Sequence, residues 1–386
     1  GAALQLSRNG AKVAVLEAEH VGWGASGRNG GHLNNGLAHS YISAKAHLGK
    51  ERAIALYHAL DASVDRLEKL IAEEGIACNF RRAGKLKLAS KPEHFKAIAA
   101  NFEVLHAEAD PDTALLSAQE LAGEINSPFH GAMLSKKSAM MHMGRFAVGL
   151  ADVARRAGAT IFEKAAVSGT KREGARHVVT TPRGTLSADN VLLATGAYTP
   201  SAFAYFRRRL INVGSFVIAT RPLSDEEIAA SVPGNRTYVT SMNIGNYFRL
   251  SPDKRLIFGG RARFTATSDQ RSDAISAEIL QASLKRLFPT LAHVPIEYCW
   301  GGLVDMTADR YPRAGYHDGL WYAMGYSGHG AQLATHLGMI MGDAISGKPD
   351  ANPLRGLDWP AVPGHFGKPW FLPLVGLYYK FLDRIS

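Results

Sequence analysis

The feature that most constrains the fold is an apolar run that ends in an acid and is followed at once by a dense group of glycines. Residues 11–17, AKVAVLE, have the composition of a buried parallel β-strand. Residues 21–36, VGWGASGRNGGHLNNG, contain six glycines. Glycine loses more conformational entropy on folding than any other residue, so this density needs a steric reason. We expect the backbone here to pass close to a bulky, flat ligand.

A strand that ends in an acid is typical of the second strand of a dinucleotide-binding unit. There the carboxylate, Glu17 in this chain, accepts hydrogen bonds from the ribose hydroxyls of the adenosine. The Gly-x-Gly-x-x-Gly loop of such a unit is expected about 20 residues before the acid, and the printed chain holds no such loop. We therefore expect a unit that lacks its first strand and its Gly-rich loop. From residues 11–17 alone, the alternative that Glu17 is only a solvated strand end is as well supported as the ribose contact.

The composition indicates a globular protein of ordinary type. Its 386 residues, 46% hydrophobic and 20% charged, are enough for two connected domains. Cys78 and Cys299 stand far apart, so neither a disulfide framework nor a metal site is expected, and a reducing, cytoplasmic setting fits best. The formal charge of +10 is spread along the chain, which favours attraction of anionic cofactors or substrates over nucleic-acid binding. No apolar run is long enough to cross a bilayer.

The pattern of predicted elements changes twice along the chain. Helices alternate with short apolar strands up to about residue 206, which favours a parallel sheet. From residue 207 to 300 strands alternate with turns, and one helix is predicted at 273–288, so we expect an antiparallel sheet with a covering helix. A strand at 320–324, a glycine turn and a helix at 331–345 then restore the first pattern.

Five segments together resemble the glycine/D-amino-acid oxidase family of FAD-dependent amine oxidoreductases. They are Glu17 at its strand end, GWGASGRNGG at 22–31, LLATGAY at 192–198, WGGLVDMTADRYPRAG at 300–315 and GYSGHGAQLA at 325–334. These segments span nearly the whole chain in the family's order, and within the family they are most similar to the gamma-glutamylputrescine oxidoreductase branch. The missing Gly-rich loop is where the chain departs from the family.

The resemblance implies an α/β fold in which an FAD-binding Rossmann-like domain, lacking its first strand and Gly-rich loop, carries an inserted, mostly antiparallel α+β substrate domain. The FAD-binding domain would comprise residues 1–80, 140–206 and 300–348, and the substrate-binding domain residues 81–139 and 207–299. Residues 349–386 would form a C-terminal tail packed on the surface. Pro373 is expected to interrupt any helix there, and docking on its own protein or on a second subunit is preferred to membrane contact.

The glycine turns are the predicted FAD contacts. In the first turn, backbone N–H groups and small side chains would lie against the pyrophosphate and the isoalloxazine; the alternative is a mobile surface loop. In the last turn, free N–H groups at a helix start would stabilise the negative charge of the reduced flavin. The resemblance adds Val167, whose main chain meets the adenine in relatives, and Gly302, in a stretch without the cysteine that binds FAD covalently in sarcosine-oxidase relatives. The predicted contacts of non-covalent FAD are Glu17, Gly24, Ser26, Gly27, Arg28, Asn29, Gly30, Gly31, Val167, Thr195, Gly196, Gly302, Gly325, Ser327, Gly328, His329, Gly330 and Gln332.

The substrate wall is expected to come from the inserted sheet. Tyr247, Arg249 and Arg261 lie on a predicted hairpin, and Trp300 ends a later strand. The rings would pack along an alkyl amine and Arg249 or Arg261 would bind a distant carboxylate. Equally open is that the rings form sheet core and the arginines face solvent. Sarcosine-oxidase relatives bind a substrate carboxylate with a lysine where this chain has Gln332, which argues for an amine whose carboxylate is remote.

The candidate catalytic residues are His329, Tyr247 and Trp300. A histidine in a glycine turn more often packs or hydrogen-bonds than acts as a base, and hydride transfer from a neutral amine needs no strong base. The loop at 305–312 would cover the other side of the cofactor, held by an ion pair between Asp309 and Arg310.

The resemblance implies oxidation of the C–N bond of a small-molecule amine, gamma-glutamylputrescine or another amine or amino acid. The α C–H bond would give hydride to flavin N5, the imine would hydrolyse to an aldehyde, and O2 would reoxidise the flavin. Three alternatives stay open: a D-amino-acid dehydrogenase that passes electrons to a quinone, a flavin domain acting on modified tRNA, and a truncated, FAD-poor fragment without catalysis. The oligomeric state is equally open.

Overall fold

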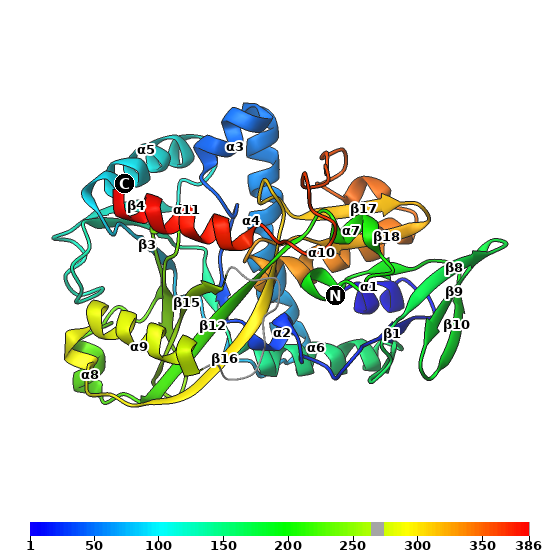
Figure 1. Ribbon diagram of the computed structural model, residues 1–386, viewed down its shortest axis with the longest axis horizontal. Helices are drawn as coiled ribbons and strands as arrows, with labels where there is room; N and C mark the ends of the chain where they lie inside the picture. The colour runs from blue at the N-terminus through cyan, green and yellow to red at the C-terminus, as the bar shows by residue number, and fades with distance from the viewer. Residues whose placement is uncertain (264–273, 386) are drawn as a thin grey trace.

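A large sheet forms the left half of the molecule in Figure 1, and smaller sheets and helices form the right half. The computed structural model describes residues 1–263 and 274–385. In spatial order the large sheet contains β16 (Ile296–Met306), β12 (Ile211–Pro222), β15 (Arg255–Arg263), β14 (Tyr247–Leu250), β13 (Thr237–Thr240), β3 (Lys85–Leu88), β5 (Gly131–Ser135) and β4 (Thr113–Ser117). Neighbouring strands are antiparallel except β13 and β3. The antiparallel sheet expected after residue 207 is therefore present, and it is extended by three strands from earlier in the chain.

The two faces of the large sheet differ because side chains alternate along each strand. On one face Leu86, Phe216 and Phe248 are fully buried beneath α9 (Ala274–Leu287). This helix is the covering helix that the sequence predicts. On the opposite face a cross-strand row runs from Trp300 through Tyr247 to Lys87. We call this opposite face, defined by these three residues with Lys85 and Arg249, the inner face of the sheet.

The smaller sheets contain the predicted acid-ended strand and the strand before the last glycine turn. β1 (Ala14–Leu16) pairs in parallel with β7 (Thr160–Phe162), and β11 (Leu192–Leu193) pairs in parallel with β18 (Leu320–Met324). β17 (Arg313–His317) is antiparallel to β18, β2 (His32–Leu33) to β6 (Ala139–Met140), and β8 (Gly169–Glu173), β9 (Arg176–Thr181) and β10 (Gly184–Ala188) form a meander. β1 is partly exposed rather than buried, because its described pairing is with β7 alone.

Helices surround the smaller sheets, with α10 (Gly330–Ile345) at their centre. Glycines let α1 (Ala2–Arg8) approach it, since a Cβ on Gly342 would lie 2.8 Å from the Gln5 Cβ. α4 (Lys50–Glu74) is the helix expected at 49–75, and it ends at Gly75, which has a φ of +64°. The helices not yet named are α2 (Ala25–Arg28), α3 (Tyr41–Leu48), α5 (Pro92–Glu108), α6 (Met143–Arg156), α7 (Ala204–Arg207) and α8 (Asp225–Ala229), with 3₁₀ turns at Gly196–Tyr198, Pro289–Leu291 and Pro349–Ala351.

The tail ends in α11 (Leu372–Ile385), which lies in front of the large sheet in Figure 1. The expectation that Pro373 interrupts a helix is wrong, because this proline stands in the first turn, where no backbone N–H is required. Leu372 is buried, whereas Leu377 and Phe381 are among several exposed apolar residues. Over the parts of the chain that the structure describes, no helix has both the length and the apolar character needed to cross a membrane.

Candidate active site

The last glycine turn is attached to the end of β16 by a buried carboxylate. Asp305 Oδ2 accepts a hydrogen bond from the Gly325 N–H at 2.5 Å, and the Asp305 carbonyl accepts one from the Ser327 N–H at 2.9 Å. Gly325 and Ser327 both have positive φ angles, +76° and +51°, so this turn has a specific, tight shape. Burial raises the pKa of Asp305 to about 6. Asp305 therefore holds the turn in place immediately before α10.

Two further predicted contact segments meet at the same place. A Cβ on Gly196, which follows β11, would lie 3.1 Å from Asp305 Oδ2. A Cβ on Gly302 would lie 3.7 Å from the Arg28 Cβ. Segments from residues 28, 196, 302 and 325 are thus neighbours in space, although the sequence separates them by up to about 300 residues. Thr195 directly precedes Gly196 and lies with it.

The first glycine segment forms the short helix α2 and lies against β16 and the inner face. Arg28 Nε donates to the Trp23 carbonyl at 2.6 Å, Arg28 Nη1 donates to the Gly301 carbonyl at 3.3 Å, and Trp300 Nε1 donates to the Arg28 carbonyl at 2.7 Å. Asn29 Oδ1 accepts from the Gly31 N–H at 2.9 Å. Gly24, Ser26 and Gly27 complete this segment, and Gly27 packs so tightly that a Cβ would lie 2.1 Å from the Gly22 carbonyl oxygen. The segment is therefore an ordered, packed structure.

Arg249 connects this glycine segment to the inner face. Its Nε donates to the Gly30 carbonyl at 2.5 Å, and its Nη2 and Nη1 donate to the carbonyls of Met141 and Leu250, each at 3.0 Å. Burial lowers the pKa of Arg249 to about 10. Because all three guanidinium nitrogens already donate to backbone carbonyls, these contacts do not favour the predicted binding of a substrate carboxylate by Arg249. Arg261 belongs to β15, but its side chain lies outside the described part of the chain.

The predicted aromatic wall lies beside the glycine segment. A Cβ on Gly30 would be 3.0 Å from a Tyr247 ring carbon, and the Tyr247 and His32 rings meet edge to face with centroids 5.3 Å apart. Gly259 leaves room for this ring, since a Cβ there would lie 2.1 Å from Tyr247 Cζ. Tyr247 and Trp300 also pack around a small cluster that contains Val217. Both predicted rings therefore lie on the inner face, opposite the covering helix.

Four buried polar atoms around the turns have no hydrogen-bond partner among the described residues. They are His329 Nδ1, Gln332 Oε1, His32 Nδ1 and Asn34 Oδ1. Gln332 Nε2 donates to the Asn34 carbonyl at 2.5 Å, which holds the amide beside α10. Burial lowers the pKa of both His329 and His32 to about 3, so both rings are neutral. Since buried polar atoms are rarely left without partners, this arrangement fits a polar ligand such as FAD and its substrate.

Glu17, Val167, Gly328 and Gly330 have contacts that do not themselves indicate a ligand. Glu17 Oε1 accepts from the Glu19 N–H at 2.9 Å at the end of β1. Val167 packs against an apolar cluster that includes Leu193 and Phe206. Gly328 has a φ of +87° and no atom within 4 Å of an added Cβ, whereas Gly330 faces the Tyr326 side chain at 3.5 Å. Their proposed contacts with FAD stay predictions.

The predicted ion pair between Asp309 and Arg310 is wrong. Asp309 Oδ2 instead accepts from Arg313 Nη2 at 2.5 Å, and the Arg313 side chain is almost fully buried. Arg310 has a φ of +61° and is exposed at the edge of a hollow of about 290 Å³. His39 and Tyr311 also line this hollow, with ring centroids 4.5 Å apart. The loop is thus held from β17, and Arg310 remains at the edge of the hollow.

Sequence reasoning missed three residues of this region. Asp305 lies inside the quoted segment WGGLVDMTADRYPRAG, where a lone carboxylate in an apolar strand is the signal that could have identified it. Lys85 and Lys87 lie on β3, where the alternation KLKL predicts only that both share one face. Which face they share was decided by the packing of Leu86 and Leu88 in the core beneath α9.

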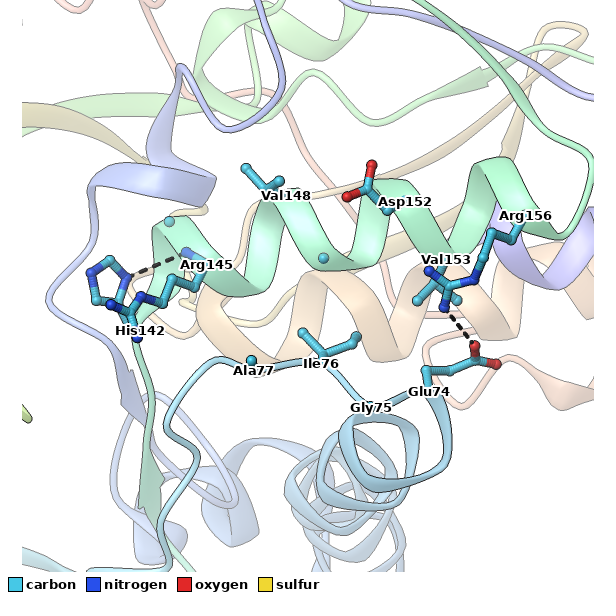
Figure 2. A pocket seen from close by; sticks show the side chains of 12 residues that line it. Glu74, Gly75, Ile76, Ala77, His142, Arg145, Val148, Asp152, Val153 and Arg156 are labelled. Atoms are coloured by element: carbon cyan, nitrogen blue, oxygen red, sulfur yellow. Dashed lines mark hydrogen bonds and ion pairs between the residues drawn. The ribbon is translucent and has the colours of Figure 1, made fainter.

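A larger hollow, of about 690 Å³, lies elsewhere, between the end of α4 and α6 (Figure 2). Figure 2 shows Arg156 Nη2 contacting Glu74 Oε2, at 3.3 Å, across one end of it, and His142 capping α6 at the other. The residues that line it include none of the predicted site residues. Hollow size alone therefore does not identify the candidate site.

The chain is similar to known proteins in three comparisons: with a family model, with the sequences of relatives and with solved structures. The family model described as FAD dependent oxidoreductase matches residues 1–344. A probable oxidoreductase, OrdL, of Haemophilus influenzae is 31% identical over 99% of this chain and 89% of its own length, and the gamma-glutamylputrescine oxidoreductase of Escherichia coli (strain K12) is 29% identical over 100% and 90%. The crystal structure of glycine oxidase from Geobacillus kaustophilus has a TM-score of 0.76 and 21% identity, covering 92% of this chain and 95% of that one. The predicted α/β fold is confirmed by this structural similarity.

Proposed function

The chain belongs to the DAO family of FAD-dependent oxidoreductases, and from this premise we propose that it oxidises a C–N bond of an amine or amino acid. The cofactor expected from the sequence is thereby confirmed as FAD. We propose further that FAD is held without a covalent bond, between the glycine turns and the inner face of the large sheet. The stretch Gly301-Gly302-Leu303 in β16 supports this, because it has no cysteine. Cys299, earlier on the same strand, packs against the core beneath α9, on the opposite face of the sheet.

The observation that best supports this location is the convergence of glycine turns around buried polar atoms without partners. The turn at Gly325 and the start of α10 would present backbone N–H groups to the negatively charged part of the ligand. His329, neutral and with an unpartnered Nδ1, would exchange one hydrogen bond with the ligand rather than act as a strong base. Tyr247 and Trp300 would confine the substrate and exclude water from the reacting carbon.

The proposed substrate is an amine that resembles gamma-glutamylputrescine, with its carboxylate distant from the reacting nitrogen. Gln332 supports this choice, because a neutral amide cannot form an ion pair with a carboxylate next to the amine. The α carbon loses two electrons and a proton as hydride, the nitrogen lone pair forms the C=N bond, and water then hydrolyses the imine to an aldehyde and an amine or ammonia. Bound FAD supplies the two-electron acceptor, and O2 is the proposed final acceptor.

Flavin absorbance tests the proposal. The purified protein should be yellow, and denaturation should release the flavin into the filtrate, as expected for non-covalent FAD. Anaerobic mixing with gamma-glutamylputrescine should bleach the flavin band, with putrescine and simple D- and L-amino acids as comparison substrates. A flavin band that no member of this panel bleaches contradicts amine oxidation, and a colourless protein without a thermal shift on added FAD contradicts the binding of FAD by this chain.

The identity of the electron acceptor is tested separately. Relatives of this chain include a D-amino acid dehydrogenase of Cereibacter sphaeroides (strain ATCC 17029 / ATH 2.4.9), 28% identical over 74% of this chain. With O2 as acceptor, each substrate oxidised should yield one hydrogen peroxide. Slow peroxide formation with rapid reduction of an artificial quinone would favour a dehydrogenase.

A further inference from the structure

Two lysines on β3 point away from the apolar core and onto the inner face. Leu86 and Leu88 are fully buried in the core beneath α9, so Lys85 and Lys87 occupy the opposite face. Lys87 pairs in register with Val239, which pairs in turn with Tyr247. Side chains in register on adjacent strands are about 5 Å apart at Cβ. Lys87 therefore lies two strands from the proposed substrate wall, in the same row.

These ammonium groups are partly buried and have no hydrogen-bonding or ion-pair partner among the contacts of the described residues. Burial lowers the pKa of Lys85 to about 8 and also lowers the pKa of Lys87. The charges of Asp61 and Asp110 partly offset the charge of Lys85, but neither carboxylate is hydrogen-bonded to it: Asp61 accepts from Lys137 Nζ at 2.8 Å, and Asp110 accepts from the Tyr57 hydroxyl at 2.6 Å. A buried charge without a partner is costly, so an arrangement of this kind indicates a missing anion.

The charges of the two lysines are coupled to those of other groups around the candidate site. The charge of Arg310, at the edge of the hollow lined by His39 and Tyr311, lowers the pKa of Lys87. The charge of Lys87 lowers the pKa of Lys85, and the charge of Lys85 lowers the pKa of His329 in the turn. Lys85 and Lys87, which share one face of β3, are therefore coupled both to Arg310 at the hollow and to His329 in the turn.

We propose that Lys85 and Lys87 form a subsite that binds a carboxylate of the substrate at the end remote from the oxidised C–N bond. This inference rests on the proposed function and makes it more specific: the substrate is an amine that also carries a negative charge, rather than a simple diamine. Arg249 on the same face is a weaker candidate for this role than the lysines, because three of its five N–H donors already bind backbone carbonyls. The cationic field also favours the neutral form of the reacting amine, which is the form that can lose hydride.

Equilibrium binding of glutarate to the FAD-loaded protein tests the subsite without turnover. Glutarate carries carboxylates and no amine, and its affinity is measured from the thermal shift and from the flavin spectrum. Lys85→Met and Lys87→Met should each weaken glutarate binding by roughly tenfold. The matched control is Lys96→Met, since Lys96 is an exposed lysine on α5 that forms an ion pair with Glu93 of the same helix. Lys87→Arg should retain most of the affinity because it keeps the charge.

Absence of glutarate binding by the unmodified protein, or equal binding by the methionine variants, overturns the subsite. The ratio of kcat/KM for gamma-glutamylputrescine to kcat/KM for putrescine gives a second measurement. This ratio should fall roughly tenfold in each methionine variant and stay unchanged in Lys96→Met. A protein that no amine reduces would contradict the proposed function, whereas the glutarate result would still decide the subsite. If Lys85→Met fails to fold, Lys87→Met and Lys87→Arg together decide the outcome.

Discussion

The two walls of the candidate site differ in the charged side chains that they carry. On the glycine-turn wall, burial lowers the pKa of His329 to about 3, so its ring is neutral, and raises the pKa of the Asp305 carboxyl to about 6. The inner face of the sheet instead carries three cations, and these differ among themselves. Arg249 donates to three carbonyls, whereas Lys85 and Lys87 lack acceptors among the described contacts. A buried cation is thus more open to a ligand where its N–H donors do not already bind backbone carbonyls.

The largest effect is expected on the turn wall, from Gly31→Ala. Gly31 has a φ of +75°, and an added Cβ would lie 2.1 Å from the Met141 carbonyl oxygen and 2.6 Å from Arg249 Nη2. We expect a loss of more than about 4 kcal/mol in the free energy of unfolding and a large loss of bound flavin. Urea unfolding and the flavin absorbance per protein measure both.

Gly174→Ala is the matched control for this substitution. Gly174 also has a positive φ, +61°, but no atom lies within 4 Å of an added Cβ. It should cost only about 1 kcal/mol, from the left-handed backbone alone, and leave the flavin content unchanged. Equal losses in the two variants would mean that close packing at Gly31 does not control the turn wall.

Arg249→Met separates the structural cation from the proposed ligand-binding cations on the sheet wall. It leaves the carbonyls of Gly30, Met141 and Leu250 without their donor, so we expect a loss of about 3 kcal/mol in urea unfolding. Lys87→Met on the same face should change stability by less than about 1 kcal/mol, because no described hydrogen bond is lost. A similar loss in both variants would remove the distinction between the two kinds of cation.

Asp305→Asn is expected to have a smaller effect than Gly31→Ala and Arg249→Met, and this effect is on the pH dependence of stability. The pKa of Asp305 is raised from 3.8 to about 6 in the folded protein, so between these values the folded state binds more protons than the unfolded state. Asp305 therefore makes stability fall as the pH rises from about 4 to 6, and the asparagine variant should lack this fall, a difference of about 2 kcal/mol. Urea unfolding from pH 4 to 7.5 measures the difference between the two proteins. If the free energy of unfolding had the same dependence on pH in both, burial would not raise the pKa of Asp305.

Much of the fold and of the turn wall could be predicted because local sequence carries the constraint. Glycine density at 22–31 and the turn before α10 require a close backbone approach wherever they occur, and the covering helix and the antiparallel sheet follow from periodicity. The ion pair of Asp309 could not be assigned in the same way. Its partner, Arg313, is only three residues further along the chain than the predicted partner, Arg310, and the choice depends on the positive φ of Arg310 and on the burial of β17.

The sequence by itself determined the family, the FAD requirement and the alternation that places Lys85 and Lys87 on one face. Only the tertiary structure decided which of the buried cations already donate hydrogen bonds to other groups of the protein. Arg249 meets Gly30 and Met141 across 219 and 108 residues, and these contacts leave the lysines as the cations with no described partner. The reason is physical: glycine and alternation act through the local backbone, whereas the fate of a buried charge depends on groups that only folding brings within hydrogen-bonding distance.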